Sequence, residues 1–193
     1  MLKSTKGLKM AVKFDSINKE HKKFIEAQKM FVVGSAGADG FINISPKGME
    51  SFKIVDGNTV VWLNYTGSGN ETSAHVQENG RMTVLFNSFE KTPLVLKLYG
   101  KAIVIHESDA RWDEMVSHFD TSVATRQFFE MKVELVLTSC RYAVPEYKFI
   151  KERDTLKKWS DKKGREGIKK YWKENNTHTL NGVETNILKL SKP

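Results

Sequence analysis

Hydrophobic and polar residues alternate along most of the first 140 positions, with the period of two that is typical of strands with one buried face. Turn-forming pairs such as Asp39-Gly40 and Asp56-Gly57 separate the alternating runs, as in β-hairpins. In the run 41–45 we expect the strand to stop at Pro46, because proline has no amide hydrogen to donate to a ladder. The predicted strands are 30–35, 41–45, 52–55, 59–65, 82–86, 94–105 and 132–138.

Apolar residues at helical spacing interrupt or follow these strands. They predict helices near 17–28 with Asp15 or Ser16 as N-cap, over 71–79, over 112–119, and in a tail of two segments, 154–163 and 165–175, separated at Gly164. Strands and helices do not alternate regularly, which argues against a doubly wound parallel sheet. The pattern favours a mainly β fold, in which six or seven antiparallel strands form a small barrel with helical caps and a helical tail.

The net charge of +8 is concentrated at the two ends of the 193-residue chain. Residues 1–23 carry +5 and residues 148–176 carry +6, whereas the body 24–147 carries −4. We therefore divide the chain into a basic N-terminal arm (1–14), a barrel domain (15–147) and a basic helical C-terminal extension (148–193). A basic stripe can bind nucleic acid, but the tail lacks repeated arginines and a Gly-aromatic pattern, so a solvated lysine-rich helix is the better interpretation.

The same sequence limits the compartment and the chemistry. It has one cysteine, Cys140, no apolar run long enough to cross a bilayer and no signal-peptide pattern, so we expect a cytoplasmic protein without a membrane partner. Its five histidines lack metal-ligand spacing, and no phosphate-loop or dinucleotide fingerprint is present. We expect no metal site, and the sequence identifies no catalytic residue. A lone cysteine that ends a strand is more often a small core residue than a nucleophile.

Two segments suit an anion. Ser45-Pro46-Lys47-Gly48 follows an alternating strand and presents a cation beside a glycine. The segment 65–72 opens a predicted helix with small polar residues, and helix N-termini attract negative charge. The alternatives are a solvated lysine at a strand end and simple N-capping by Ser68 or Asn70. Because the two segments follow consecutive strands of one sheet, we expect them to lie side by side and to bind a phosphate.

At these residues the sequence resembles the FMN-binding split-barrel family related to pyridoxamine 5'-phosphate oxidase, in particular its uncharacterised bacterial branch. The resemblance runs from about residue 24 into the tail. The motifs that carry it are FVVGSA at 31–36 with Asp39-Gly40, INISPKG at 42–48, LNYTGSGNET at 63–72, Asn79-Gly80-Arg81, LYGKA at 98–102, SCRYAVP at 139–145 and RDTL at 153–156.

The resemblance implies a split antiparallel barrel that forms a homodimer, with FMN bound at the subunit interface. It implies that Lys47 holds the FMN phosphate, that residues at the Asn64-Tyr65 position line the flavin, and that the turn 67–70 meets the phosphate. The segment around Cys140 would border the ring. The implied cofactor-binding residues are Ser45, Lys47, Gly48, Asn64, Tyr65, Ser68, Asn70 and Cys140.

The chain departs from the vitamin-processing oxidases of this family at two places. Ser68-Gly69 stands where those enzymes carry an Arg-Lys pair, and their C-terminal substrate motif is missing. We therefore expect a flavin-dependent oxidoreductase that acts on another small molecule, with no useful oxidation of pyridoxamine phosphate. The alternatives are a protein that binds or senses flavin, deazaflavin or haem without turnover, and a nucleic-acid-associated protein that acts through its basic ends.

Overall fold

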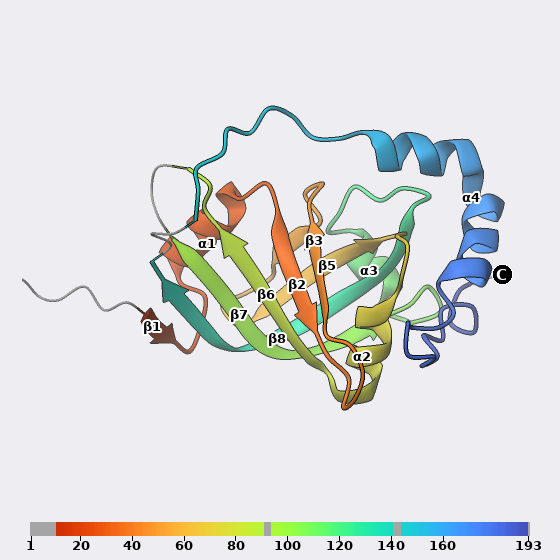
Figure 1. Cartoon of the computed structure of the whole chain (residues 1–193), viewed down its shortest axis with the longest axis horizontal. Coiled ribbons are helices and arrows are strands. Elements are labelled where there is room, and N and C mark those ends of the chain that lie inside the picture. The colour runs from red at the N-terminus through yellow and green to blue at the C-terminus, as the bar shows by residue number, and fades with distance from the viewer. Residues whose placement is uncertain (1–10, 91–93, 141–143, 193) are drawn as a thin grey trace, which may run out of the picture.

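The computed structural model describes residues 11–90, 94–140 and 144–192. Its elements follow one another in an order dominated by strands, with three short helices between strands and a long one after the last strand (Figure 1). They are β1 (Ala11–Phe14), α1 (Lys19–Ala27), β2 (Phe31–Ser35), β3 (Asn43–Lys47), β4 (Phe52–Ile54), β5 (Thr59–Tyr65), α2 (Glu71–Asn79), β6 (Arg81–Asn87), β7 (Val95–Ile105), α3 (Trp112–Val116), β8 (Thr125–Ser139) and α4 (Thr155–Asn175).

The strands form one curled sheet of eight antiparallel strands in the order β3-β2-β6-β7-β8-β5-β4, with β1 paired to the end of β8. The first half of β8, 125–132, pairs with β5, and residues 128–139 pair with β7. The end strands β3 and β4 are not paired with each other, so the barrel is split. Aromatic packing crosses the split, because the ring of Phe31 in β2 lies 5.1 Å from that of Phe52 in β4. The predicted mainly β split barrel with helical additions is confirmed.

The main core fills the concave side of the curl, where the inward residues of the alternating strands meet. Trp62 stacks on Phe129 at 4.6 Å between ring centroids, and Val33, Val84, Leu98 and Val136 are fully buried around them. A second cluster packs α3 against the other face of β5 and β8. Both faces of β5 are therefore covered, which explains why its residues Val60–Leu63 are continuously apolar instead of alternating.

The structure differs from the sequence predictions in β3, α1 and β8, and α3 ends at Val116 instead of at the predicted 119. β3 runs through Pro46, which faces Val32 in the ladder, and it does not include residues 41–42. Proline is tolerated there because β3 pairs on one side only. The N-cap of α1 is Asn18, whose side chain accepts from the His21 amide, and neither Asp15 nor Ser16. β8 is much longer than the predicted 132–138, because strands on both sides cover it.

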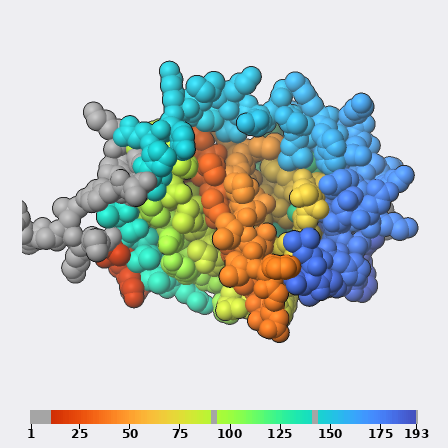
Figure 2. All heavy atoms as spheres, in the orientation of Figure 1, coloured from red at the N-terminus to blue at the C-terminus, as the bar shows by residue number. Residues whose placement is uncertain are grey.

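The C-terminal extension wraps across the molecule. Residues 144–154 run over the open end of the barrel to α4, and the chain end then packs beside α2 (Figures 1 and 2). The predicted break at Gly164 is confirmed: its φ of 64° and ψ of 177° divide α4 into two helical parts. Only glycine adopts this region without strain. The second part buries Ile168 and Trp172 against Ile187.

Candidate cofactor site

A cavity of about 410 Å³ lies where β3, β5, the turn 66–70 and the start of α2 meet. The structure places six of the eight predicted cofactor-binding residues around this cavity, from both of the segments that suit an anion. They are Ser45, Lys47, Asn64, Tyr65, Ser68 and Asn70. The two segments lie side by side because β3 and β5 stand near the two sides of the split in the barrel.

Lys47 enters the cavity from the edge strand β3. The period of two along this strand places Asn43, Ser45 and Lys47 on the same side, and all three line the cavity. The Lys47 Nζ lies 5.0 Å from the centroid of the Trp62 ring, a cation–π contact. Burial, together with the positive charge of Arg126, lowers the pKa of Lys47 from its ordinary value of 10.5 to about 8.

Arg126 is a second cation in the same cavity, contributed by the start of β8. Its Nη1 donates to the Gly69 carbonyl at 3.0 Å and to the Asn176 Oδ1 at 2.8 Å. With its amide oxygen turned toward Arg126, Asn64 accepts from Nη2 at 3.0 Å. Burial lowers the pKa of Arg126 to about 9. Sequence reasoning missed this residue, because Arg126 stands between the polar Thr125 and Gln127, ahead of the predicted strand 132–138, and no local pattern marks it as buried.

Neither cation forms an ion pair with a carboxylate among residues 11–90, 94–140 and 144–192. Glu71 also lines the cavity, but both of its carboxylate oxygens accept from the Leu180 amide, each at 3.2 Å. A buried charge without a compensating partner costs several kcal/mol. The cavity therefore holds an excess of positive charge and favours an anion.

Buried polar atoms without hydrogen-bond partners are concentrated in the residues that line this cavity. Within the described part of the chain, six buried side-chain nitrogen or oxygen atoms lack a partner, and five belong to residues that line it. Those five are Ser45 Oγ, Trp62 Nε1, Arg126 Nε and both amide atoms of Asn70. Asn70 occupies the N-cap position of α2, but its side chain makes no capping hydrogen bond. Because each unsatisfied buried group costs about 1–3 kcal/mol, this arrangement is typical of a site built for a polar ligand.

The C-terminal helix α4 positions the turn 66–70. The buried Trp172 donates from Nε1 to the Thr66 Oγ1 at 2.8 Å. Asn176, which is also fully buried, donates from Nδ2 to the Gly67 carbonyl at 3.1 Å while its Oδ1 accepts from Arg126. Two residues more than 100 positions away in sequence therefore hold this turn. The basic extension therefore supports the turn, and it contributes Leu180 to the lining of the cavity.

Two of the predicted residues lie elsewhere. Gly48 lines the neighbouring cavities, where a Cβ would come within 3.4 Å of the Lys29 carbonyl. Cys140 is half-buried just beyond the end of β8, opposite the end that carries Arg126. Of the family motif that follows it, residues 141–143 lie outside the described residues. Within one chain, the cavity is built without Cys140.

Two features are absent from the residues that the structure describes, 11–90, 94–140 and 144–192. No group of three or more His, Cys, Asp or Glu side chains in them is arranged to hold a metal ion. No helix in them is long and apolar enough to cross a membrane.

Comparison with known proteins gives the family. Residues 17–140 match the model of the pyridoxamine 5'-phosphate oxidase family. The chain is 34% identical, over 141 residues, to the pyridoxamine 5'-phosphate oxidase family protein ustO of Aspergillus flavus, an alignment that covers 70% of this chain and 57% of that protein. The chain thus spans little more than half the length of this curated relative.

Two solved structures share the fold. A single-residue variant of HupZ from Group A Streptococcus is 21% identical with a TM-score of 0.52, and the match covers 63% of this chain and 98% of that one. A Lactobacillus delbrueckii protein, described as a candidate pyridoxamine 5'-phosphate oxidase, is 16% identical with a TM-score of 0.51, covering 64% and 94%. Sequence and fold agree: the chain belongs to the pyridoxamine 5'-phosphate oxidase family.

Proposed function

We propose that this protein binds FMN in the cavity between β3, β5 and α2, and that it acts as a flavin-dependent oxidoreductase on a small molecule. The observation that carries the proposal is the pair of buried cations, Lys47 and Arg126, which have no carboxylate partner among the described residues and stand beside unpaired polar side chains. A phosphate carries close to two negative charges at neutral pH and accepts several charge-assisted hydrogen bonds. It would therefore balance the charge of the two cations and supply hydrogen-bond partners to the unpaired polar side chains.

The residues divide into two groups in this proposal. Lys47, Arg126 and the amide of Asn70 would hold the phosphate, with the N-terminus of α2 beside them. Arg126 would supply the second cation that the Ser68-Gly69 turn lacks in comparison with the vitamin-processing enzymes. Trp62, Asn64 and Tyr65 would line the remainder of the cofactor. When bound, a flavin supplies hydride transfer, and the protein supplies orientation and electrostatics.

We also propose that two copies associate along β3. Next to the cavity, Phe41, Ile42 and Ile44 are 67%, 71% and 72% exposed, although monomeric proteins rarely expose such clusters. A homodimer would bury them, and stable interfaces of this kind often exceed about 2,000 Å². Light scattering should give twice the monomer mass, and Ile44→Glu should lower it. A wild-type monomer that still binds FMN would refute the dimer.

The experiment for the cofactor is equilibrium dialysis of the purified full chain against FMN, with mass identification of any flavin released on denaturation. We expect stoichiometric binding with a Kd below about 1 μM, near −8 kcal/mol. No binding at micromolar FMN would refute the proposal. Reduction of the bound flavin by NADH or NADPH, followed by reoxidation, separates an oxidoreductase from a protein that only stores or senses the cofactor. Pyridoxamine 5'-phosphate should not be turned over.

A further inference from the structure

A second, larger cavity of about 880 Å³ lies beneath the segment 147–159, between it, the end of α1 and the end of β3. Its walls are largely apolar and aromatic. They include Met30, Met49, Phe89, Tyr147, Phe149 and Trp159. Flat apolar walls of this kind favour a flat apolar ligand, and concave sites lined mainly by such side chains are the usual form of small-molecule sites.

The same cavity is rimmed by an excess of cations. Five basic residues line it, Lys29, Lys47, Lys148, Lys151 and Arg153, against the two acidic residues Glu90 and Glu152. The segment 147–159 contributes three of the five, so the basic character of the C-terminal extension is directed at this cavity as well as at solvent. An apolar cavity with a positively charged rim is complementary to an amphipathic anion.

The fold holds these walls in place. The Tyr147 amide donates to the Phe89 carbonyl at 2.9 Å, and the Lys29 ammonium lies 5.8 Å from the centroid of the Phe149 ring. At the other end, the Trp159 ring packs edge-on against the Tyr171 ring in the second part of α4, with 5.1 Å between the ring centroids. The segment 147–159 thus contacts the body at Phe89 and Lys29, and it contacts the second part of α4 through Trp159.

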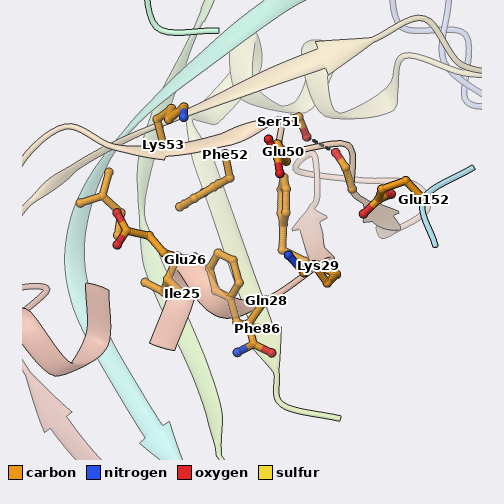
Figure 3. Close-up of a pocket in the computed structure, with 13 residues that line it drawn as sticks. Ile25, Glu26, Gln28, Lys29, Glu50, Ser51, Phe52, Lys53, Phe86 and Glu152 are labelled. Atoms are coloured by element: carbon orange, nitrogen blue, oxygen red, sulfur yellow. Dashed lines mark hydrogen bonds between the residues drawn. The ribbon is translucent and has the colours of Figure 1, made fainter. Parts of the chain in front are cut away.

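A smaller cavity beside it has different chemistry. Phe52 and Phe86 line it, with charged side chains around them (Figure 3). The centroids of the two rings are 5.0 Å apart. Its two lysines are offset by three glutamates, Glu26, Glu50 and Glu152, so it lacks the positive excess of the larger cavity. Lys47 lines both the larger cavity and the proposed cofactor site, which makes the larger cavity the immediate neighbour of that site.

We propose that the cavity beneath 147–159 binds the second reactant of the flavin reaction, and that this reactant is an organic anion with a flat apolar body, such as an aromatic carboxylate or sulfonate. The apolar body would lie against Phe149 and Trp159, and its acidic group would face Lys148 and Lys151. This inference rests on the proposed function for the role of the ligand, but the binding itself does not require FMN.

The test uses 8-anilinonaphthalene-1-sulfonate, an aromatic sulfonate whose fluorescence rises in apolar surroundings, titrated into the full-length protein with and without FMN. Lys151→Glu reverses one charge at the cavity. Lys157→Glu is the matched control, because Lys157 is an exposed lysine on the first turn of α4 that does not line the cavity. Trp159→Phe keeps an aromatic wall but removes a tryptophan that can transfer excitation energy to the bound probe.

We expect one saturable site, a probe Kd at least tenfold weaker in Lys151→Glu than in Lys157→Glu, and reduced energy transfer with little change of Kd in Trp159→Phe. Equal affinities of the two glutamate variants, or no saturable binding, would overturn the proposal. FMN binding is measured on the same samples and should be unchanged in all three variants. If the wild type does not bind FMN but binds the probe as expected, the proposed function is refuted and the anion site is supported.

Discussion

Replacing Lys47 by methionine should stabilise the protein without ligand and weaken its affinity for FMN. Methionine keeps an unbranched stem beside Trp62 but removes a buried charge that has no carboxylate partner in the described chain. The pKa of Lys47 falls from 10.5 to about 8, and at 1.36 kcal/mol per unit this corresponds to about 3 kcal/mol of unfavourable energy at pH 7. Loss of the cation–π contact with Trp62 destabilises the folded variant by about 0.5–2 kcal/mol, which reduces this gain in stability.

The net gain in the free energy of unfolding is therefore about 1–2.5 kcal/mol at pH 7. In a chain of this size each kcal/mol raises Tm by roughly 2–4 °C. The sign depends on pH. Between pH 8 and 10.5 the unfolded chain holds a proton on Lys47 that the folded chain has released, so the wild type gains stability as pH rises through this window. The variant lacks the group, and its advantage should disappear near pH 10.5.

Affinity should change in the opposite direction. Removing a cation from a buried phosphate costs about 2–5 kcal/mol, which corresponds to a loss of roughly 30-fold or more in FMN binding. We expect the lower end of this range, because Arg126 remains in the cavity. Riboflavin has no phosphate and should lose little, so the ratio of the two losses isolates the lysine–phosphate interaction.

Urea denaturation at pH 7 and 10.5 measures stability, and calorimetric titration with FMN and riboflavin measures affinity. Lys53→Met, at an exposed position of β4, is the control that should change neither quantity. A destabilised Lys47→Met protein would show that the ammonium is well accommodated without a ligand. Equal losses for FMN and riboflavin would mean that Lys47 supports the shape of the site and does not hold the phosphate.

Three other predictions test the site and the sheet. Asn176→Asp places a carboxylate at the 2.8 Å contact with Arg126. It should weaken FMN binding at least tenfold while riboflavin binding changes little, because the carboxylate would compete with the phosphate for Arg126. An equal loss for both ligands would indicate a structural role alone. In the wild type, FMN affinity should fall as pH rises above about 8, because Lys47 loses its proton. In Lys47→Arg the affinity should stay constant over the same pH range. A matching decline in that variant would exclude Lys47 as the source. In Gly100→Ala the new Cβ would lie 1.9 Å from a carbonyl of β8 and should cost more than about 2 kcal/mol in urea denaturation, whereas Gly34→Ala, with its nearest atom at 4.0 Å, should be tolerated.

The sequence determined the local elements of this protein and the chemical character of its site. Alternation predicts most of the strands, because a residue's side of the sheet depends only on its parity along the chain. Gly164 marks the break in α4, since the required backbone angles belong to glycine. Ser45, Lys47 and the polar turn before α2 indicate an anion, because strand ends and helix N-termini present unsatisfied donors.

Only the tertiary structure decided which distant residues complete the site. Arg126 lies 57 positions from Gly69 and 50 from Asn176, yet it donates to both. Trp172 reaches Thr66 across 106 positions. No local pattern encodes these contacts, since they depend on the strand order and on the path of the tail over the barrel. β3 continues through Pro46 for the same reason: whether a missing amide matters depends on whether a neighbouring strand stands opposite it, and only the assembled sheet determines that.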